Sequence, residues 1–108
     1  MSDITLQEMQ QMQNLLQEKY LDKWGGLSPE KSVRMLLWMY GELGEAADVI
    51  KKEGIWKIQS DPLVRQHFVE ELCDAMMYFN DILLCFDISP EEFQKIYHEK
   101  HNKNMNRW

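Results

Sequence analysis

Apolar residues return every three or four positions along most of the chain, a spacing that predicts amphipathic helices rather than strands. Glycine and proline signals divide the pattern into four long stretches, at about residues 5–24, 28–53, 61–86 and 89–107. The segment 54–60 lacks a helical period, so we predict a connection there that stays exposed or folds over the site. The pattern therefore predicts an all-α fold, and four helices of this length favour a four-helix bundle.

Local signals set the expected helix ends. Thr5 and Glu8 have the spacing of a capping box, in which each side chain bonds the backbone N–H of the other residue. A serine precedes a proline at 28–29 and again at 89–90, which favours a capping serine with proline at the first helical position. Gly54 is a typical stop after the second helix.

The second predicted helix has two unlike faces. We expect its apolar face to form the core, and that face comprises Val33, Leu36, Leu37, Tyr40, Leu43, Ala47 and Ile50. Glu42 and Glu45 lie one turn apart on the opposite face, where Trp38 precedes them by one further turn. Gly41 and Gly44 each cost about 1 kcal/mol relative to alanine inside a helix, so we expect another group to approach the backbone there.

The third predicted helix has a similar pair of stripes. Its polar stripe comprises His67, Glu71, Asp74, Tyr78 and Asp81. The apolar stripe beside it comprises Phe68, Leu72, Ala75, Met76, Phe79 and Leu83. Glu71 and Asp74 lie one turn apart, so this helix also presents a carboxylate pair.

Two carboxylate pairs predict a metal site if the helices that bear them pack together. Four anionic groups would then converge, and they repel one another unless protons or divalent cations neutralise them. Oxygen-only ligands favour Mg²⁺, with Mn²⁺ as a substitute. The predicted ligands are Glu42, Glu45, Glu71 and Asp74. The alternative is that these acids simply form solvated helix faces.

The sequence around both acidic pairs resembles that of a known family. Gly-Glu-Leu-Gly-Glu-Ala-Ala-Asp at 41–48 and Glu-Glu-Leu-Cys-Asp-Ala at 70–75 are similar to the signature of the MazG-like all-alpha nucleoside triphosphate pyrophosphohydrolases. The resemblance covers about residues 30–107. It implies a MazG-like all-alpha architecture and Mg²⁺-dependent hydrolysis of a nucleoside triphosphate to a monophosphate and pyrophosphate.

The resemblance also suggests roles for single residues. We predict Glu45, with Glu42, as the catalytic carboxylates, Glu45 being the residue nearest the attacking water. Asp81 shares the stripe of the second acidic pair and is a fifth candidate ligand and substrate contact. The candidate walls for the base are Trp38, Tyr78 and, on the connection, Trp56.

One face of the fourth predicted helix is apolar in its first half and polar in its second half. Its inward stripe begins with Phe93, Ile96 and Tyr97 and continues at the same phase as Lys100, Asn104 and Arg107. Lysine and arginine are the usual partners of phosphate, so we predict that the polar part of this stripe binds substrate phosphates. The alternative is a polar end that frays into solvent. This pattern also resembles that of the dimeric dUTPase relatives, which implies deoxypyrimidine triphosphates such as dUTP or dCTP.

Composition narrows the choices. At 108 residues the chain is expected to be a single domain, 1–108, with little core to spare, which favours a homodimer or homotetramer. A net charge of −6 argues against nucleic-acid binding, and no apolar run approaches the roughly 20 residues of a membrane span. Cys73 and Cys85 lack metal-site spacing and follow no signal peptide, so we expect reduced, buried thiols in a cytoplasmic protein.

Two other functions compete with the hydrolase. A di-iron carboxylate bundle needs Glu-x-x-His pairs, and the residues three positions before the histidines are not glutamates, so we reject it. A non-enzymatic helical interaction module would bind other proteins through its acidic and methionine-rich faces. That module predicts no dependence on a metal ion.

Overall fold

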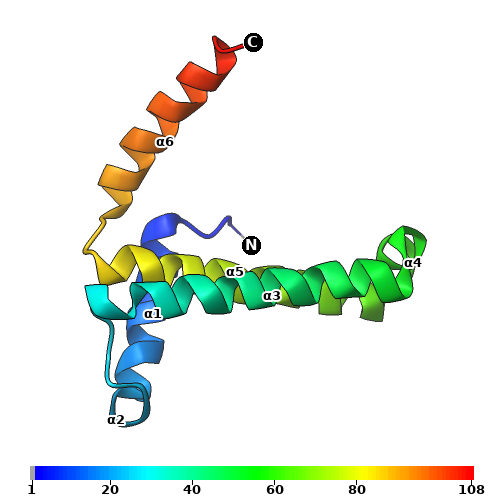
Figure 1. The fold of residues 1–108 in the computed structure, drawn as a ribbon, viewed down its shortest axis with the longest axis horizontal. Coiled ribbons are helices and arrows are strands. Elements are labelled where there is room, and N and C mark those ends of the chain that lie inside the picture. The colour runs from blue at the N-terminus through cyan, green and yellow to red at the C-terminus, as the bar shows by residue number, and fades with distance from the viewer. Residues whose placement is uncertain (1) are drawn as a thin grey trace.

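The computed structural model describes residues 2–108, and every regular element within them is helical, which confirms the all-α prediction. In chain order the elements are α1 (Leu6–Lys19), α2 (Leu21–Trp24), the 3₁₀ turn η1 (Pro29–Lys31), α3 (Ser32–Glu53), α4 (Ile55–Ser60), α5 (Pro62–Cys85) and α6 (Pro90–Met105). Figure 1 shows that α3 and α5 lie side by side in opposite directions and form the long body of the molecule. α1 crosses the end of this pair where α5 finishes.

Most predicted helix ends are confirmed, with three corrections. Ser28 precedes Pro29 as predicted, but its side chain makes no capping hydrogen bond, and the segment opens with the 3₁₀ turn η1. Thr5 and Glu8 form the capping box, and Asp61 and Ser89 cap α5 and α6 through their side chains. The predicted helix 5–24 is wrong as a single element, because it breaks at Tyr20 between α1 and α2. The predicted connection 54–60 contains the helix α4.

The predicted core face of α3 is wrong for a single chain. All seven of its apolar residues are exposed, and the side chains of Val33 and Tyr40 are each 63% accessible. α3 instead turns Met35, Ala46 and Val49 inward against α5. The reason is that the carboxylate face of α3 packs against α5, which leaves the apolar face of α3 without a cover.

α5 and α6 show the same deficit of apolar contacts. Leu72 and Met76 of the predicted α5 stripe are exposed. α6 leaves the body, and it contacts α5 through Phe93, whose ring lies edge-on to that of Phe79 at 5.4 Å. The inward stripe predicted for α6 is wrong beyond Phe93, since Ile96 and Tyr97 are exposed. The four long helices therefore do not close into a bundle within one chain.

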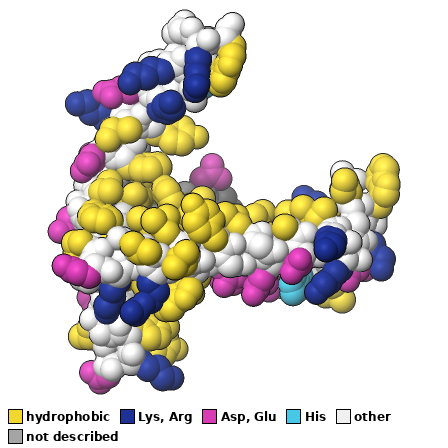
Figure 2. Space-filling model, in the orientation of Figure 1, with side chains coloured by type: hydrophobic (Ala, Val, Ile, Leu, Met, Phe, Trp, Pro, Cys, Tyr) yellow, Lys and Arg dark blue, Asp and Glu magenta, His cyan; other side chains and the backbone are white. Residues whose placement is uncertain are grey.

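The chain exposes more surface than a compact domain of its mass. Its accessible surface is 8592 Å², whereas a folded monomer of 13.0 kDa exposes about 6,300 Å². Its radius of gyration is 16.3 Å, against about 13 Å for a compact domain of this length. Figure 2 shows apolar side chains gathered where α6 leaves the body and along one edge of the α3–α5 pair.

Two further predictions concern the environment of the chain. Across residues 2–108, no helix combines the length and the apolar content that crossing a membrane requires. Both cysteines are free thiols, but only Cys85 is buried, so the prediction of a buried Cys73 is wrong.

Candidate metal centre and its pocket

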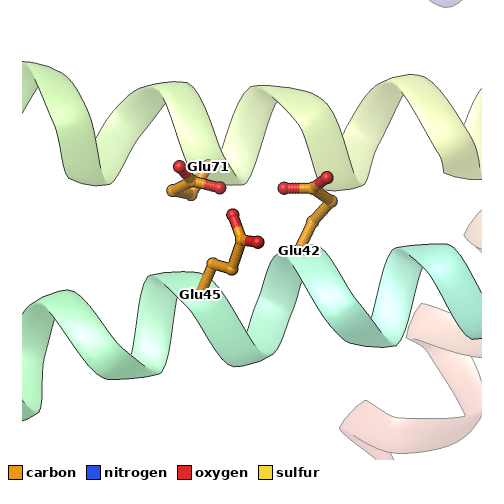
Figure 3. A group of neighbouring side chains, drawn as sticks. All are labelled: Glu42, Glu45 and Glu71. Carbon is orange, nitrogen blue, oxygen red and sulfur yellow. The ribbon is translucent and has the colours of Figure 1, made fainter.

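Three of the four predicted ligands converge between the two long helices. Glu42 and Glu45 come from α3 and Glu71 comes from α5, and one carboxylate oxygen from each lies within 4.8 Å of the others (Figure 3). We call these three residues the acid cluster. The cluster forms because residues three apart share a helix face, and because α3 turns that face toward α5.

The acid cluster concentrates negative charge from two helices. The pKa of Glu45 lies above its ordinary value, chiefly because of Glu71. A hydrogen bond with Glu71 favours the protonated form of Glu45, and the negative charge of Glu71 disfavours the ionised form. One basic partner is His67, whose Nε2 lies 3.3 Å from Oε1 of Glu71. The other Glu71 oxygen, Oε2, is buried and has no hydrogen-bond partner within residues 2–108.

These features fit a hard divalent cation. Three carboxylates supply the oxygen ligands that Mg²⁺ and Mn²⁺ prefer, and the unpartnered Glu71 oxygen is available for one bond. Asp74, the fourth predicted ligand, lies outside the acid cluster, although its charge still raises the pKa of Glu45. A methyl group added at Gly41 or Gly44 would meet no atom of the described chain within 4 Å, so any group that approaches these glycines comes from outside the described chain.

A pocket of about 530 Å³ opens beside the acid cluster, and we call it the aromatic pocket. Its walls include Trp24, Trp38 and Tyr78, and it reaches Glu42 and Asp74 at the cluster end. The rings of Trp38 and Tyr78 lie 5.8 Å apart, so the structure brings together two residues predicted to wall a base. Burial, followed by nearby carboxylates, raises the pKa of Tyr78, so its hydroxyl stays protonated at neutral pH.

Asp81 lies on the wall of the aromatic pocket, away from the acid cluster. It is 4% exposed, and its Oδ1 accepts a hydrogen bond of 2.9 Å from Nε2 of Gln13. Burial raises the pKa of Asp81, while the amides of Gln13 and Gln17 lower it. Ten residues of helix place it about 15 Å along α5 from Glu71. Asp81 is therefore not part of the acid cluster, and its roles as a fifth metal ligand and as a substrate contact stay predictions.

Sequence reasoning missed several residues of this pocket. The sequence does not distinguish Gln13 from the other glutamines of α1. The contact between α1 and α5 identifies it as a pocket residue. Lys23, Lys31 and Arg34 also line the pocket, and the Arg34 guanidinium lies 5.8 Å from the Trp38 ring. A second hollow of about 570 Å³ lies on the other side of the cluster, and Lys52 lines it.

The remaining predicted contacts lie elsewhere in the chain. Lys100, Asn104 and Arg107 belong to the α6 arm and its end, which project away from the body, and they line neither hollow (Figure 1). Trp56 of α4 is 80% exposed and lies outside both hollows. One chain therefore brings the acidic and aromatic candidates together but not the C-terminal ones.

Neither a protein-family model nor a curated protein nor a solved structure gives a significant match to the chain. The resemblance to MazG-like enzymes therefore stays a prediction that depends on the two acidic pairs.

Proposed function

We propose that the chain is a Mg²⁺-dependent nucleoside triphosphate pyrophosphohydrolase of MazG-like type. The observation that carries this proposal is the acid cluster, with its unpartnered Glu71 oxygen, directly beside an aromatic-walled pocket. Hard oxygen ligands suit an ion that also binds phosphates, and aromatic walls suit a flat base. The substrate is then a triphosphate whose phosphates lie at the cluster and whose base lies in the pocket.

The chemistry follows from the charges of these residues. Bound Mg²⁺ would neutralise phosphate charge and act as a Lewis acid. Glu45 accepts the proton of the attacking water, because its carboxylate lies in the acid cluster where the phosphates are held. The water oxygen bonds to one phosphorus of the anhydride between the α- and β-phosphoryl groups. The bond from that phosphorus to the bridging oxygen breaks, and a nucleoside monophosphate and pyrophosphate leave. Glu42 lies beside Glu45 and would be a ligand of the same ion.

A second copy of the chain supplies what one copy lacks. The exposed surface exceeds that of a compact monomer by roughly 2,300 Å², and a stable interface buries about 800 Å² from each partner. We propose a homodimer or homotetramer in which the apolar faces of α3 and α5 meet and complete a four-helix bundle. In this assembly α6 of one subunit brings Lys100, Asn104 and Arg107 to the phosphates held by its partner.

The test is a screen of the common nucleoside triphosphates with Mg²⁺, in which pyrophosphate and orthophosphate are measured separately. We expect pyrophosphate and a monophosphate in equal amounts, and no turnover with EDTA present. Orthophosphate as the only primary product, or turnover that survives EDTA, would overturn the assignment.

The exposed apolar faces also favour a second candidate, a helical module that binds other proteins. The two candidates differ in their response to ligands. The hydrolase is stabilised in thermal melting by Mg²⁺ with a nucleoside triphosphate, because ligands that bind only the folded state raise its melting temperature. The absence of both stabilisation and product would favour the module.

A further inference from the structure

We propose that Asp81 and Gln13 read the nucleobase and select bases that carry an exocyclic amine, cytosine or adenine, over their keto counterparts. This inference rests on the proposed function in one respect, which is that the acid cluster holds the phosphates. The observation behind it is a buried carboxylate in the wall of the aromatic pocket, which accepts a hydrogen bond from the neutral amide of Gln13 and has the Gln17 amide nearby.

The position of Asp81 suits contact with a base. Glu71, Tyr78 and Asp81 follow one another along the same side of α5, from the acid cluster through the aromatic wall to the far end of the pocket. Glu71 and Asp81 are separated by about 15 Å along the helix axis. A nucleotide bound with its phosphates at Glu71 therefore extends its base past Tyr78 toward Asp81.

The chemistry of Asp81 favours a ligand that donates hydrogen bonds. A carboxylate can accept about four hydrogen bonds, and among residues 2–108 Gln13 makes the one bond of good geometry to it. Asp81 also forms no ion pair, because the salt bridges of the described chain are Lys57–Glu53 and His67–Glu71. A buried, unpaired carboxylate is costly, and N–H donors from a ligand would offset that cost.

An exocyclic amine can donate a hydrogen bond to the Asp81 carboxylate, whereas a keto oxygen cannot. The exocyclic amine of cytosine or adenine offers two N–H groups to Asp81. The keto oxygen of uracil or hypoxanthine would instead face the carboxylate with lone pairs, and both groups would lose their hydration. A site built around an acceptor therefore rejects the keto base more strongly than pocket shape alone would.

A purely structural role makes a different prediction. If the bond between Gln13 and Asp81 only fastens α1 to α5, its loss would lower stability and leave the choice of base unchanged. Affinity for matched base pairs separates the two roles, because the members of each pair have nearly the same shape.

The experiment is calorimetric titration of the full chain with dCMP against dUMP and with dAMP against dIMP, in the presence of Mg²⁺. The wild type should bind the amino member of each pair about 10- to 100-fold more tightly. Asp81→Asn, which can donate to a keto oxygen, should shift that ratio toward the keto member, whereas Asp87→Asn, outside the pocket, should keep the wild-type ratio. Equal affinities in the wild type would overturn the proposal even if the Asp81 variant does not fold.

Binding of monophosphates involves no hydrolysis, so the two proposals can fail separately. Triphosphate turnover without amino preference, or with a ratio that a folded Asp81→Asn leaves unchanged, would refute base reading and spare the hydrolase. Amino-selective binding with no pyrophosphate released from any triphosphate would refute the hydrolase and support base reading.

Discussion

The two faces of α3 differ in chemistry, because one carries carboxylates and the other is apolar. The face toward α5 gathers Glu42 and Glu45 in a cluster of like charges, whereas the opposite face exposes Val33, Tyr40 and other apolar side chains. Carboxylates held close together favour a bound cation, and an exposed apolar stripe favours contact with another protein surface. We therefore expect a cation at the acid cluster and a second protein surface against the apolar face of α3.

The acidic face should show the largest response to mutation. Glu45→Gln keeps the side-chain volume but removes the proposed base, so we expect kcat to fall about 10²- to 10⁴-fold in pyrophosphate release. Glu70→Gln on the exposed side of α5 is the matched control and should retain wild-type kcat. Equal losses in both variants would mean that net charge, rather than the acid cluster, sets the rate.

The apolar face should respond through assembly. Tyr40→Lys places a charge in the proposed interface, and we expect the dissociation constant of the oligomer to rise by about 100-fold or more. Ile55→Lys on α4 is a control of equal exposure, 63%, outside the proposed interface of α3 and α5. Light scattering should give a multiple of 13.0 kDa for the wild type and the control, and a mass near 13.0 kDa for dilute Tyr40→Lys. A monomeric wild type would contradict this expectation.

A mixing experiment tests whether Arg107 of one subunit acts at the acid cluster of its partner. Glu45→Gln and Arg107→Ala should each be nearly inactive alone. If α6 acts on the partner subunit, exchanged heterodimers contain one intact site, and the mixture should recover about a quarter of wild-type activity. Pyrophosphate release after subunit exchange measures this. No recovery in a mixture shown to contain heterodimers would place the action of Arg107 elsewhere.

The smallest effect expected is a pH dependence of stability. The pKa of Glu45 is raised above its ordinary 4.5 in the folded chain, so the folded state keeps this proton to higher pH than the unfolded state. Without metal, the free energy of unfolding should therefore fall as pH rises from about 4.5 through the folded pKa. Urea denaturation should show a flatter profile for Glu45→Gln, with a residual slope of the same sign from Asp81, whose pKa is also raised. A profile that rises over this range would contradict the charge repulsion.

Local patterns predicted much of this molecule, and contacts between distant segments explain the remainder. The capping box at Thr5, the stop at Gly54 and the acidic pair on α3 depend on neighbours within one turn, so the sequence predicted them. The orientation of α3 was not predictable in the same way, because an apolar stripe packs equally well inside a chain or between chains. The bond between Gln13 and Asp81 joins residues 68 positions apart, and only tertiary packing reveals it.

The most direct test of the central claim is thermal melting during titration with Mg²⁺, for the wild type, Glu71→Gln and Glu70→Gln. We predict that Mg²⁺ raises the melting temperature of the wild type and Glu70→Gln in a saturable way, because the ion binds the folded acid cluster. Glu71→Gln, which loses the charge beside the other two carboxylates, should show little or no rise. A wild type that does not respond to Mg²⁺ or Mn²⁺, or a Glu71→Gln variant that responds as fully as the wild type, would contradict the metal centre.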